Sequence, residues 1–222
     1  MTTDPVFRLY QLPGWGSAIP EAQLAFYGLG YELIETGNVT DPASSVAAIR
    51  EVNPLGQLPV LDLPDGTRMT ETAAMTLHLA DLAGSEALVP GPKAPERADF
   101  LRWLIFIVAN IYPCFTFAEV PTRYVSDAEA GDYRERVTER EKHLWRVLGE
   151  AAAARGGPWV LGQRFSALDI YVAVMANWRP GPSWFGEYEP GLLAIAQATA
   201  ARPELAPVFA RNFPAGAPGA AP

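Results

Sequence analysis

The first third of the chain alternates strand-like and helix-like segments. Short β-favouring runs are separated by segments with helical spacing of apolar residues, and Pro or Gly stands at most boundaries. A strand, a helix and a second strand in succession imply a parallel pair joined by a right-handed crossover. The expected strands are 7–12, 31–34, 60–63 and 67–69, and the expected helices are 18–29, 43–52 and 71–83, with Gly30 and Gly84 as C-terminal caps.

This order, β-α-β-α-β-β-α, predicts a thioredoxin-like domain with its helices packed on a four-stranded mixed sheet. Beyond it the sequence becomes rich in Gly, Pro and Lys and then shows only helical signals, so the fold class is α/β followed by all-α. We expect four regions: a thioredoxin-like domain at 1–84, a linker at 85–95, an all-helical domain at 96–213 and a disordered tail at 214–222.

The overall charge and the single cysteine exclude several classes of protein. A net charge of −8 argues against nucleic-acid binding, and Cys114 alone permits neither an intrachain disulfide nor a cysteine metal cluster. We therefore expect no metal. The start of the chain lacks the features of a signal peptide, and the most apolar run, 103–118, is short for a membrane span and contains Asn110 and Pro113. These features predict a cytoplasmic protein that does not enter a membrane.

Two short motifs in the first domain stand at boundaries between expected strands, loops and helices. Pro59 precedes an expected strand, and an X-Pro bond is the kind of peptide bond that can adopt the cis form at low cost. Glu71 and Thr72 stand where a strand meets a helix, so free N–H groups there can bind a carboxylate. The alternative interpretation is that Pro59 ends a loop and Thr72 caps a helix.

These motifs, Asn53–Leu61 and Thr70–Ala73 with the intervening Asp65-Gly66 turn, resemble the glutathione-binding half of the glutathione transferases. The resemblance implies that reduced glutathione is bound by Gln57, Leu58, Pro59, Glu71 and Thr72. It assigns the cysteinyl part of glutathione to the Leu58 backbone. The γ-glutamyl carboxylate is assigned to Thr72 and the helix start, and the ammonium group to Glu71.

A third motif, Trp159–Tyr171, resembles the folding motif of the helical domain in the same family. Ser166 is an expected N-cap and Asp169 stands three residues later, which is the spacing of a capping box. Its expected role is structural, because it starts a helix and carries no chemistry.

The loop Leu12–Pro20 resembles the active loop of the bacterial beta-class enzymes, except that Gly16 occupies the position of their cysteine. Thiol transfer through a cysteine at this position is therefore not expected. Ser17 begins the first helix and is the predicted catalytic residue, because its hydroxyl and the helix start would both stabilise a bound thiolate. The alternative interpretation is that Ser17 is only a helix cap.

Three aromatic residues are candidates for the wall of a pocket for the second substrate: Trp15, Phe106 and Tyr112. Each has a structural alternative: Phe106 and Tyr112 are core or cleft-wall residues, as aromatic residues at helical spacing more often are, and Trp15 covers the start of the first helix. Cys114 is expected to be a buried structural thiol.

The sequence therefore predicts a glutathione transferase that uses glutathione as co-substrate and conjugates its thiolate to a small apolar electrophile. The alternative is a non-catalytic protein that binds glutathione or hydrophobic ligands on the same scaffold. A purely protein–protein module is a third interpretation, which predicts no glutathione binding. The resemblance also implies a homodimer.

Overall fold

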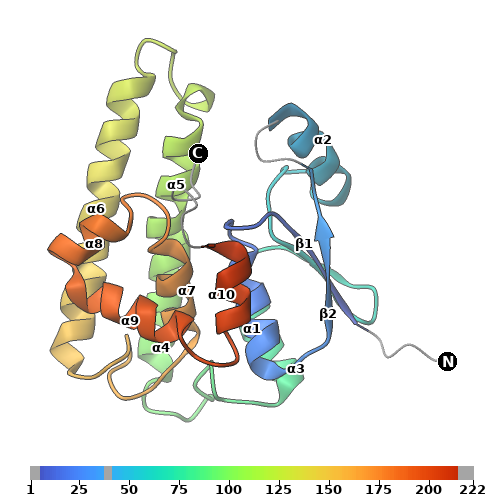
Figure 1. Cartoon of the computed structure of the whole chain (residues 1–222), viewed down its shortest axis with the longest axis vertical. Coiled ribbons are helices and arrows are strands. Elements are labelled where there is room, and N and C mark those ends of the chain that lie inside the picture. The colour runs from blue at the N-terminus through green and yellow to red at the C-terminus, as the bar shows by residue number, and fades with distance from the viewer. Residues whose placement is uncertain (1–5, 38–41, 215–222) are drawn as a thin grey trace. The chain divides into compact units, whose positions relative to one another are not determined.

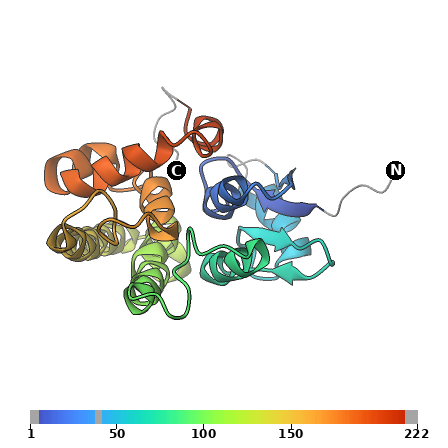
Figure 2. The same cartoon turned by 90° about the horizontal axis from the view of Figure 1, so that it is seen from below.

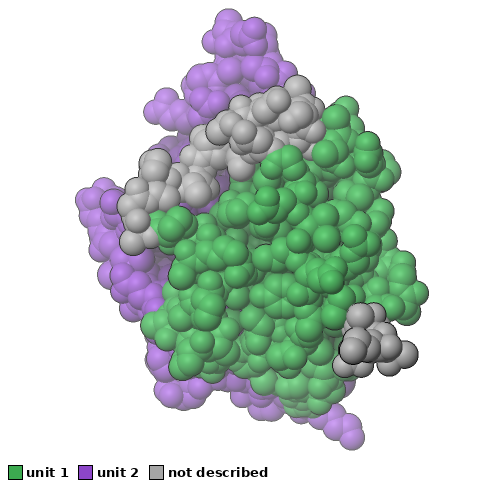
Figure 3. All heavy atoms as spheres, turned by 45° about the vertical axis from the view of Figure 1, so that its right-hand side comes forward, with its two compact units in different colours: residues 1–88, 200–220 green, residues 89–199, 221–222 purple. Residues whose placement is uncertain are grey.

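The computed structural model describes residues 6–37 and 42–214, which divide into two compact units (Figure 3). Of the described residues, the first unit contains 6–88 and 200–214, and the second contains 89–199. The expected tail at 214–222 falls, except for its first residue, outside the described part of the chain.

The first unit is built on a mixed sheet with the strand order β2-β1-β3-β4. β1 and β2 are parallel, as the crossover predicted, while β3 is antiparallel to both β1 and β4. The predicted order of strands and helices and the thioredoxin-like fold are thus confirmed. The bounds are β1 Phe7–Gln11, α1 Ala18–Tyr27, β2 Tyr31–Glu35, α2 Pro42–Val52, β3 Val60–Asp62, β4 Arg68–Met69, α3 Thr72–Ala83 and α10 Ala206–Asn212 (Figure 1).

Helices α1 and α3 lie side by side against the sheet (Figure 2). Side chains alternate along β1, so that Phe7 and Leu9 are buried in the core while Arg8 and Tyr10 point to the opposite face. The buried core of this unit consists of Phe7, Leu9, Leu24, Leu61, Leu63, Met75 and Leu79.

The end of α1 differs from the prediction. Gly28, not Gly30, is its C-terminal cap, because Gly28 takes the left-handed conformation with φ 66° and donates its N–H to the end of the helix. The carbonyl of Gly30 instead accepts a hydrogen bond of 3.1 Å from the N–H of Phe7, which aligns the starts of β1 and β2. The predicted cap of α3, Gly84, is confirmed with φ 57°.

Helix α10 groups with the first unit, although the sequence assigned residues 96–213 to the helical domain. The physical reason is its packing against α1, where Asn212 and Arg211 both bind Glu21. A helix at the end of the chain shows no local sign of which core it joins.

The second unit is helical. In it α6 packs along α5, and α4 contacts α7. Its elements are α4 Arg97–Phe106, the π-helical η1 Ile107–Ile111, α5 Tyr112–Glu119, the 3₁₀ turn η2 Pro121–Arg123, α6 Ala130–Arg155, α7 Ala167–Met175, α8 Pro182–Tyr188 and α9 Pro190–Ala200, whose last residue falls in the first unit.

The predicted capping box at the start of α7 is confirmed. Ser166 Oγ accepts from the N–H of Leu168 at 3.3 Å, and the Asp169 carboxylate accepts from the N–H of Ser166 at 2.7 Å. Asp169 also accepts from the N–H of Val160 at 2.8 Å, so the motif ties the preceding turn to the helix.

One helix in the described part of the chain, Arg97–Glu119, is long and apolar enough to cross a membrane by length and composition alone. Core helices of globular proteins pass the same test. Phe100, Trp103 and Leu104 on this helix are buried in the second unit, so the finding is weak evidence for a membrane span.

Candidate functional site

The β3–β4 hairpin sets the geometry of the candidate glutathione site. Its turn is closed by the carboxylate of Asp65, which accepts a hydrogen bond of 2.8 Å from the N–H of Thr67, and by Gly66 with φ 87°. The strands pair Leu61 with Met69 and Asp62 with Arg68. The turn predicted at Asp65-Gly66 is thus confirmed.

Both predicted motifs lie at the open end of this hairpin. The Leu58–Pro59 peptide bond is cis and leads directly into β3, while Glu71 follows β4 and leads into α3. Continuing the β3–β4 register beyond its last pair sets Pro59 across from Glu71. Leu58 is half-buried, and its backbone N–H and C=O form no hydrogen bond with another described residue. The sheet therefore brings together two segments that the sequence separates.

The loop before Pro59 is held by Asn53, which is buried at the end of α2. Asn53 Nδ2 donates to the carbonyl of Gln57 at 2.8 Å, and Asn53 Oδ1 accepts from the N–H of Leu55 at 3.1 Å. These two bonds fix the peptide next to Leu58. The side chain of Gln57 is exposed.

Glu71 has a left-handed backbone with φ 67°, and it is the one non-glycine residue with positive φ in the described part of the chain. Such conformations cost about 1–3 kcal/mol and concentrate at binding and catalytic sites. Its carbonyl accepts the first α3 hydrogen bond, from Met75 at 3.0 Å, which leaves the N–H groups of Thr72 and Ala73 outside the helical ladder. The Glu71 side chain is exposed and does not cap the helix. This is a suitable geometry for a ligand carboxylate and ammonium.

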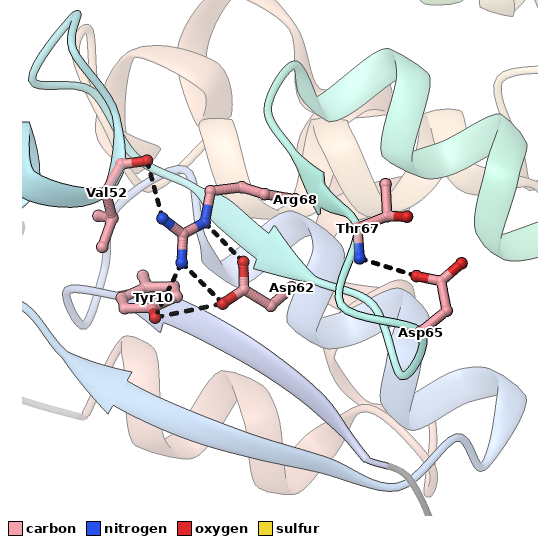
Figure 4. A network of polar contacts seen from close by, with 6 residues as sticks. All are labelled: Tyr10, Val52, Asp62, Asp65, Thr67 and Arg68. Carbon is pink, nitrogen blue, oxygen red and sulfur yellow. Dashed lines mark hydrogen bonds and ion pairs between the residues drawn. The ribbon is translucent and has the colours of Figure 1, made fainter.

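A polar network on the face of the sheet away from α1 and α3 joins β1, β3, β4 and the end of α2 (Figure 4). Arg68 binds Asp62 through two nitrogens, with Nε–Oδ1 2.6 Å and Nη2–Oδ2 2.9 Å. Arg68 Nη2 also donates to the hydroxyl of Tyr10 at 3.3 Å, and Nη1 donates to the carbonyl of Val52 at 3.4 Å. Its hydrogen bonds hold the pKa of Asp62 below its usual range. The network connects the hairpin to the residue that precedes Asn53.

The active loop between β1 and α1 is ordered by its own hydrogen bonds. The N–H of Trp15 donates to the carbonyl of Leu12 at 3.2 Å, and Gly14 has φ 79°, which with Pro13 before it is the pattern of a type II turn. The N–H groups of Gly16 and Ser17, just before α1, form no hydrogen bond with another described residue.

Ser17 occupies the N-cap position of α1, but its side chain does not cap the helix. Its buried hydroxyl donates to the carbonyl of Leu12 at 3.1 Å and accepts from the N–H of Leu12 at 3.3 Å. The cap role is therefore corrected: the hydroxyl braces the loop because Leu12 lies within reach and the first-turn N–H groups do not bond it. A bond from this hydroxyl to a thiolate stays a prediction.

The predicted pocket residues belong to different units. Trp15 is half-buried in the first unit. In the second, Phe106 meets Trp103 edge to face at 5.1 Å, and Tyr112 meets Trp178 edge to face at 5.4 Å. The pocket stays a prediction. Cys114 is buried, its thiol donates to the carbonyl of Asn110, and burial raises its pKa to about 11, which fits a structural thiol.

Sequence reasoning missed two parts of the first unit. The Arg68–Asp62 ion pair could have been predicted from the sequence, because the two residues carry opposite charges and face each other once the β3–β4 register is known. Asn212, whose Oδ1 accepts a 3.0 Å hydrogen bond from the N–H of Gly14, lies 198 residues away and has no local signal. Among the described residues no group of three or more His, Cys, Asp or Glu side chains is arranged to hold a metal ion.

Comparison with known proteins supports the fold of the chain. Residues 22–82 match the model of the glutathione S-transferase N-terminal domain. The chain is 34% identical to the uncharacterized GST-like protein YncG of Escherichia coli K12, over 93% of this chain and 98% of that protein. It is 27% identical to the glutathione S-transferase GstA of Escherichia coli O157:H7, over 89% and 94% of the two chains.

Among solved structures, a glutathione transferase homologue from Sulfitobacter with bound glutathione superposes with a TM-score of 0.79 and 26% identity, over 92% of this chain and 97% of that one. The chain belongs to the glutathione S-transferase superfamily.

Proposed function

We propose that this protein binds reduced glutathione in its first unit and conjugates the glutathione thiolate to a small apolar electrophile. One observation carries the proposal: Leu58, whose backbone forms no hydrogen bond with another described residue, and Glu71, with its positive φ, lie at the same end of one hairpin, next to the start of α3. The glutathione bound by the Sulfitobacter homologue supports the choice of ligand.

Each part of glutathione has a proposed partner. The half-buried Leu58 backbone pairs with the cysteinyl residue, in the manner of an added strand, and Gln57 and Pro59 flank it. Thr72 and the free N–H groups of α3 bind the γ-glutamyl carboxylate, and Glu71 pairs with the ammonium group. We propose that the chain does not transfer thiols through cysteine, because residue 16 is glycine and Cys114 is buried.

We propose that the thiol is ionised at the start of α1. Ser17 contributes there in two ways: its N–H, with that of Gly16, faces the anion, and its hydroxyl holds the turn that places them. Lowering the pKa of a thiol from about 8.5 by one or two units requires roughly 1.4 kcal/mol of differential stabilisation per unit. A helix terminus with free N–H groups provides interactions of this size.

A second candidate function is non-catalytic binding of glutathione or apolar ligands. It is favoured by one observation: the Ser17 hydroxyl already donates to Leu12, so no side chain of the loop is committed to the thiol. The likeness to YncG leaves both functions open.

Two measurements test the proposal. Titration calorimetry of the full-length protein with reduced glutathione should give a dissociation constant in the micromolar to millimolar range. An assay with a generic aryl halide should then show conjugation above the uncatalysed rate. Binding without turnover would establish the second candidate, and absence of binding would refute both. A homodimer, tested by light scattering, and a cytoplasmic location are further proposals from the family resemblance.

A further inference from the structure

Asn212, at the end of α10, uses every polar group of its side chain. Its Oδ1 accepts a 3.0 Å hydrogen bond from the N–H of Gly14 in the active loop. Its Nδ2 donates to Glu21 Oε2 at 2.9 Å and to the carbonyl of Val208 at 3.0 Å. Asn212 is 2% exposed, so these bonds form away from water and are costly to lose.

Glu21 fixes which way the amide of Asn212 points. This carboxylate is fully buried on α1 and also binds Arg211 and the hydroxyl of Tyr31. A carboxylate is an acceptor only, so the NH₂ group of Asn212 must face Glu21. The amide oxygen is then directed at Gly14. A buried charge on one helix therefore determines the group that meets the active loop.

Gly14 is the residue of the active loop that Asn212 on α10 contacts. It is the third residue of the turn Leu12–Trp15, with φ 79°, and its N–H points out of that turn. The hydroxyl of Ser17 holds the turn at Leu12, and Asn212 holds it at Gly14. The N–H groups of Gly16 and Ser17 follow immediately, so their direction depends on these two supports.

We propose that Asn212 is a positioning residue for thiol activation, acting through Gly14 on the N–H groups of Gly16 and Ser17. The inference rests on the proposed function, because the thiolate is the group those N–H groups are placed to meet. It makes α10 part of the active-site support, although Asn212 touches neither glutathione nor the electrophile.

The test compares Asn212→Ala with the neighbouring Arg211→Gln in the full-length protein. Both variants remove a partner of Glu21, but only Asn212→Ala removes the contact with the loop. In the free protein, amide hydrogen exchange should be about ten-fold faster in Asn212→Ala at Gly14, whose N–H loses its acceptor, and at Trp15, whose N–H bonds Leu12 within the same turn. Arg211→Gln should leave exchange at these residues within about two-fold of wild type.

The glutathione complex provides the second readout. In Asn212→Ala the pKa of the bound thiol, measured by thiolate ultraviolet absorbance, should rise and kcat should fall. The KM for glutathione should stay within about two-fold, since Glu71 and Thr72 are unchanged. If Asn212→Ala does not fold, Asn212→Leu keeps the side-chain volume without the bond to Gly14 and should show the same faster exchange and higher thiol pKa.

The outcomes separate the two proposals. Wild-type protein that does not bind glutathione would refute the proposed function and, with it, the role of Asn212 in activation. Wild-type protein that binds glutathione, combined with unchanged loop exchange and thiol pKa in Asn212→Ala, would overturn the inference alone. Equal effects of Asn212→Ala and Arg211→Gln on loop exchange would also overturn it, because they would indicate general loosening of α10.

Discussion

The hydroxyl of Ser17 bonds both polar backbone groups of Leu12: it donates to the carbonyl at 3.1 Å and accepts from the N–H at 3.3 Å. Leu12 directly follows β1, where the chain leaves the sheet and its N–H and C=O lose their strand partners. The buried hydroxyl is the acceptor for the N–H of Leu12 and shares the carbonyl of Leu12 with the N–H of Trp15. Ser17, the residue that the sequence predicts to be catalytic, therefore also holds the loop in place.

Replacing Ser17 by Ala should lower the free energy of unfolding by about 1–3 kcal/mol, because the buried N–H of Leu12 loses its acceptor and the carbonyl keeps only the bond from Trp15. Urea denaturation measures this loss. Ser126→Ala is the matched control, since Ser126 is exposed and its side chain bonds Glu129 in its own turn; its effect should stay within about 0.5 kcal/mol. Equal stability of wild type and Ser17→Ala would contradict the bracing role. A direct role on the thiol predicts in addition a higher pKa of bound glutathione.

Glu71 combines a strained backbone with a proposed ligand contact, and two substitutions separate these properties. Glu71→Gln keeps the shape and removes the charge, so glutathione affinity should fall about ten-fold as the ammonium loses its partner. Glu71→Gly should weaken binding similarly without lowering the free energy of unfolding, because glycine adopts φ 67° without steric cost. Calorimetry and urea denaturation measure the two effects. Unchanged affinity in Glu71→Gln would exclude the carboxylate as the ammonium partner.

Arg68→Met should destabilise the protein by about 1 kcal/mol at neutral pH, since a two-nitrogen contact with Asp62 is lost at a partly exposed site. The folded state lowers the pKa of Asp62, so this contribution is present above the unfolded pKa and is lost as the pH falls through the folded value. The difference between wild type and variant should therefore shrink in acid.

The control for this experiment is Arg136→Met, which removes an exposed pair with Asp132 on α6 at 2.8 Å, does not involve Asp62 and should have little effect. A destabilisation by Arg68→Met that is independent of pH would show that Asp62 does not carry the interaction.

Glu141 is a buried acid on α6, so we expect the protein to lose stability as the pH rises. Burial raises its pKa to about 8, although the 3.3 Å hydrogen bond that Trp145 Nε1 donates to its Oε1 lowers the pKa. Its Oε2 has no partner among the described residues. A raised pKa contributes stability below the unfolded value, near 4.5, and this is lost as the pH rises through 8. Glu141→Gln should remove this loss, on the order of a few kcal/mol.

Thermal melts from pH 5 to about 9 measure the effect of Glu141, because this pH range includes its raised pKa of about 8. Glu139→Gln is the control on the same helix, since Glu139 is exposed and pairs with Lys142. Parallel pH profiles of wild type and Glu141→Gln would show that this carboxyl does not titrate in the predicted range.

Features of the fold that depend on neighbouring residues could be predicted from the sequence. The period of apolar residues and the position of glycine and proline determined the order of strands and helices. The capping box formed as predicted because Ser166 and Asp169 are only three residues apart. Where two glycines competed, as at Gly28 and Gly30, the local pattern did not decide which one ends α1.

The candidate site divides in the same way. From the sequence came the expectation that Pro59, Glu71 and Thr72 belong to one site, through the resemblance of their two motifs to the glutathione transferases. Only the tertiary structure decided that Glu71 is left-handed, that the Ser17 hydroxyl bonds Leu12, and that Asn212 reaches Gly14. The last contact joins residues 198 positions apart, and such a contact depends on how whole helices pack, which no local pattern encodes.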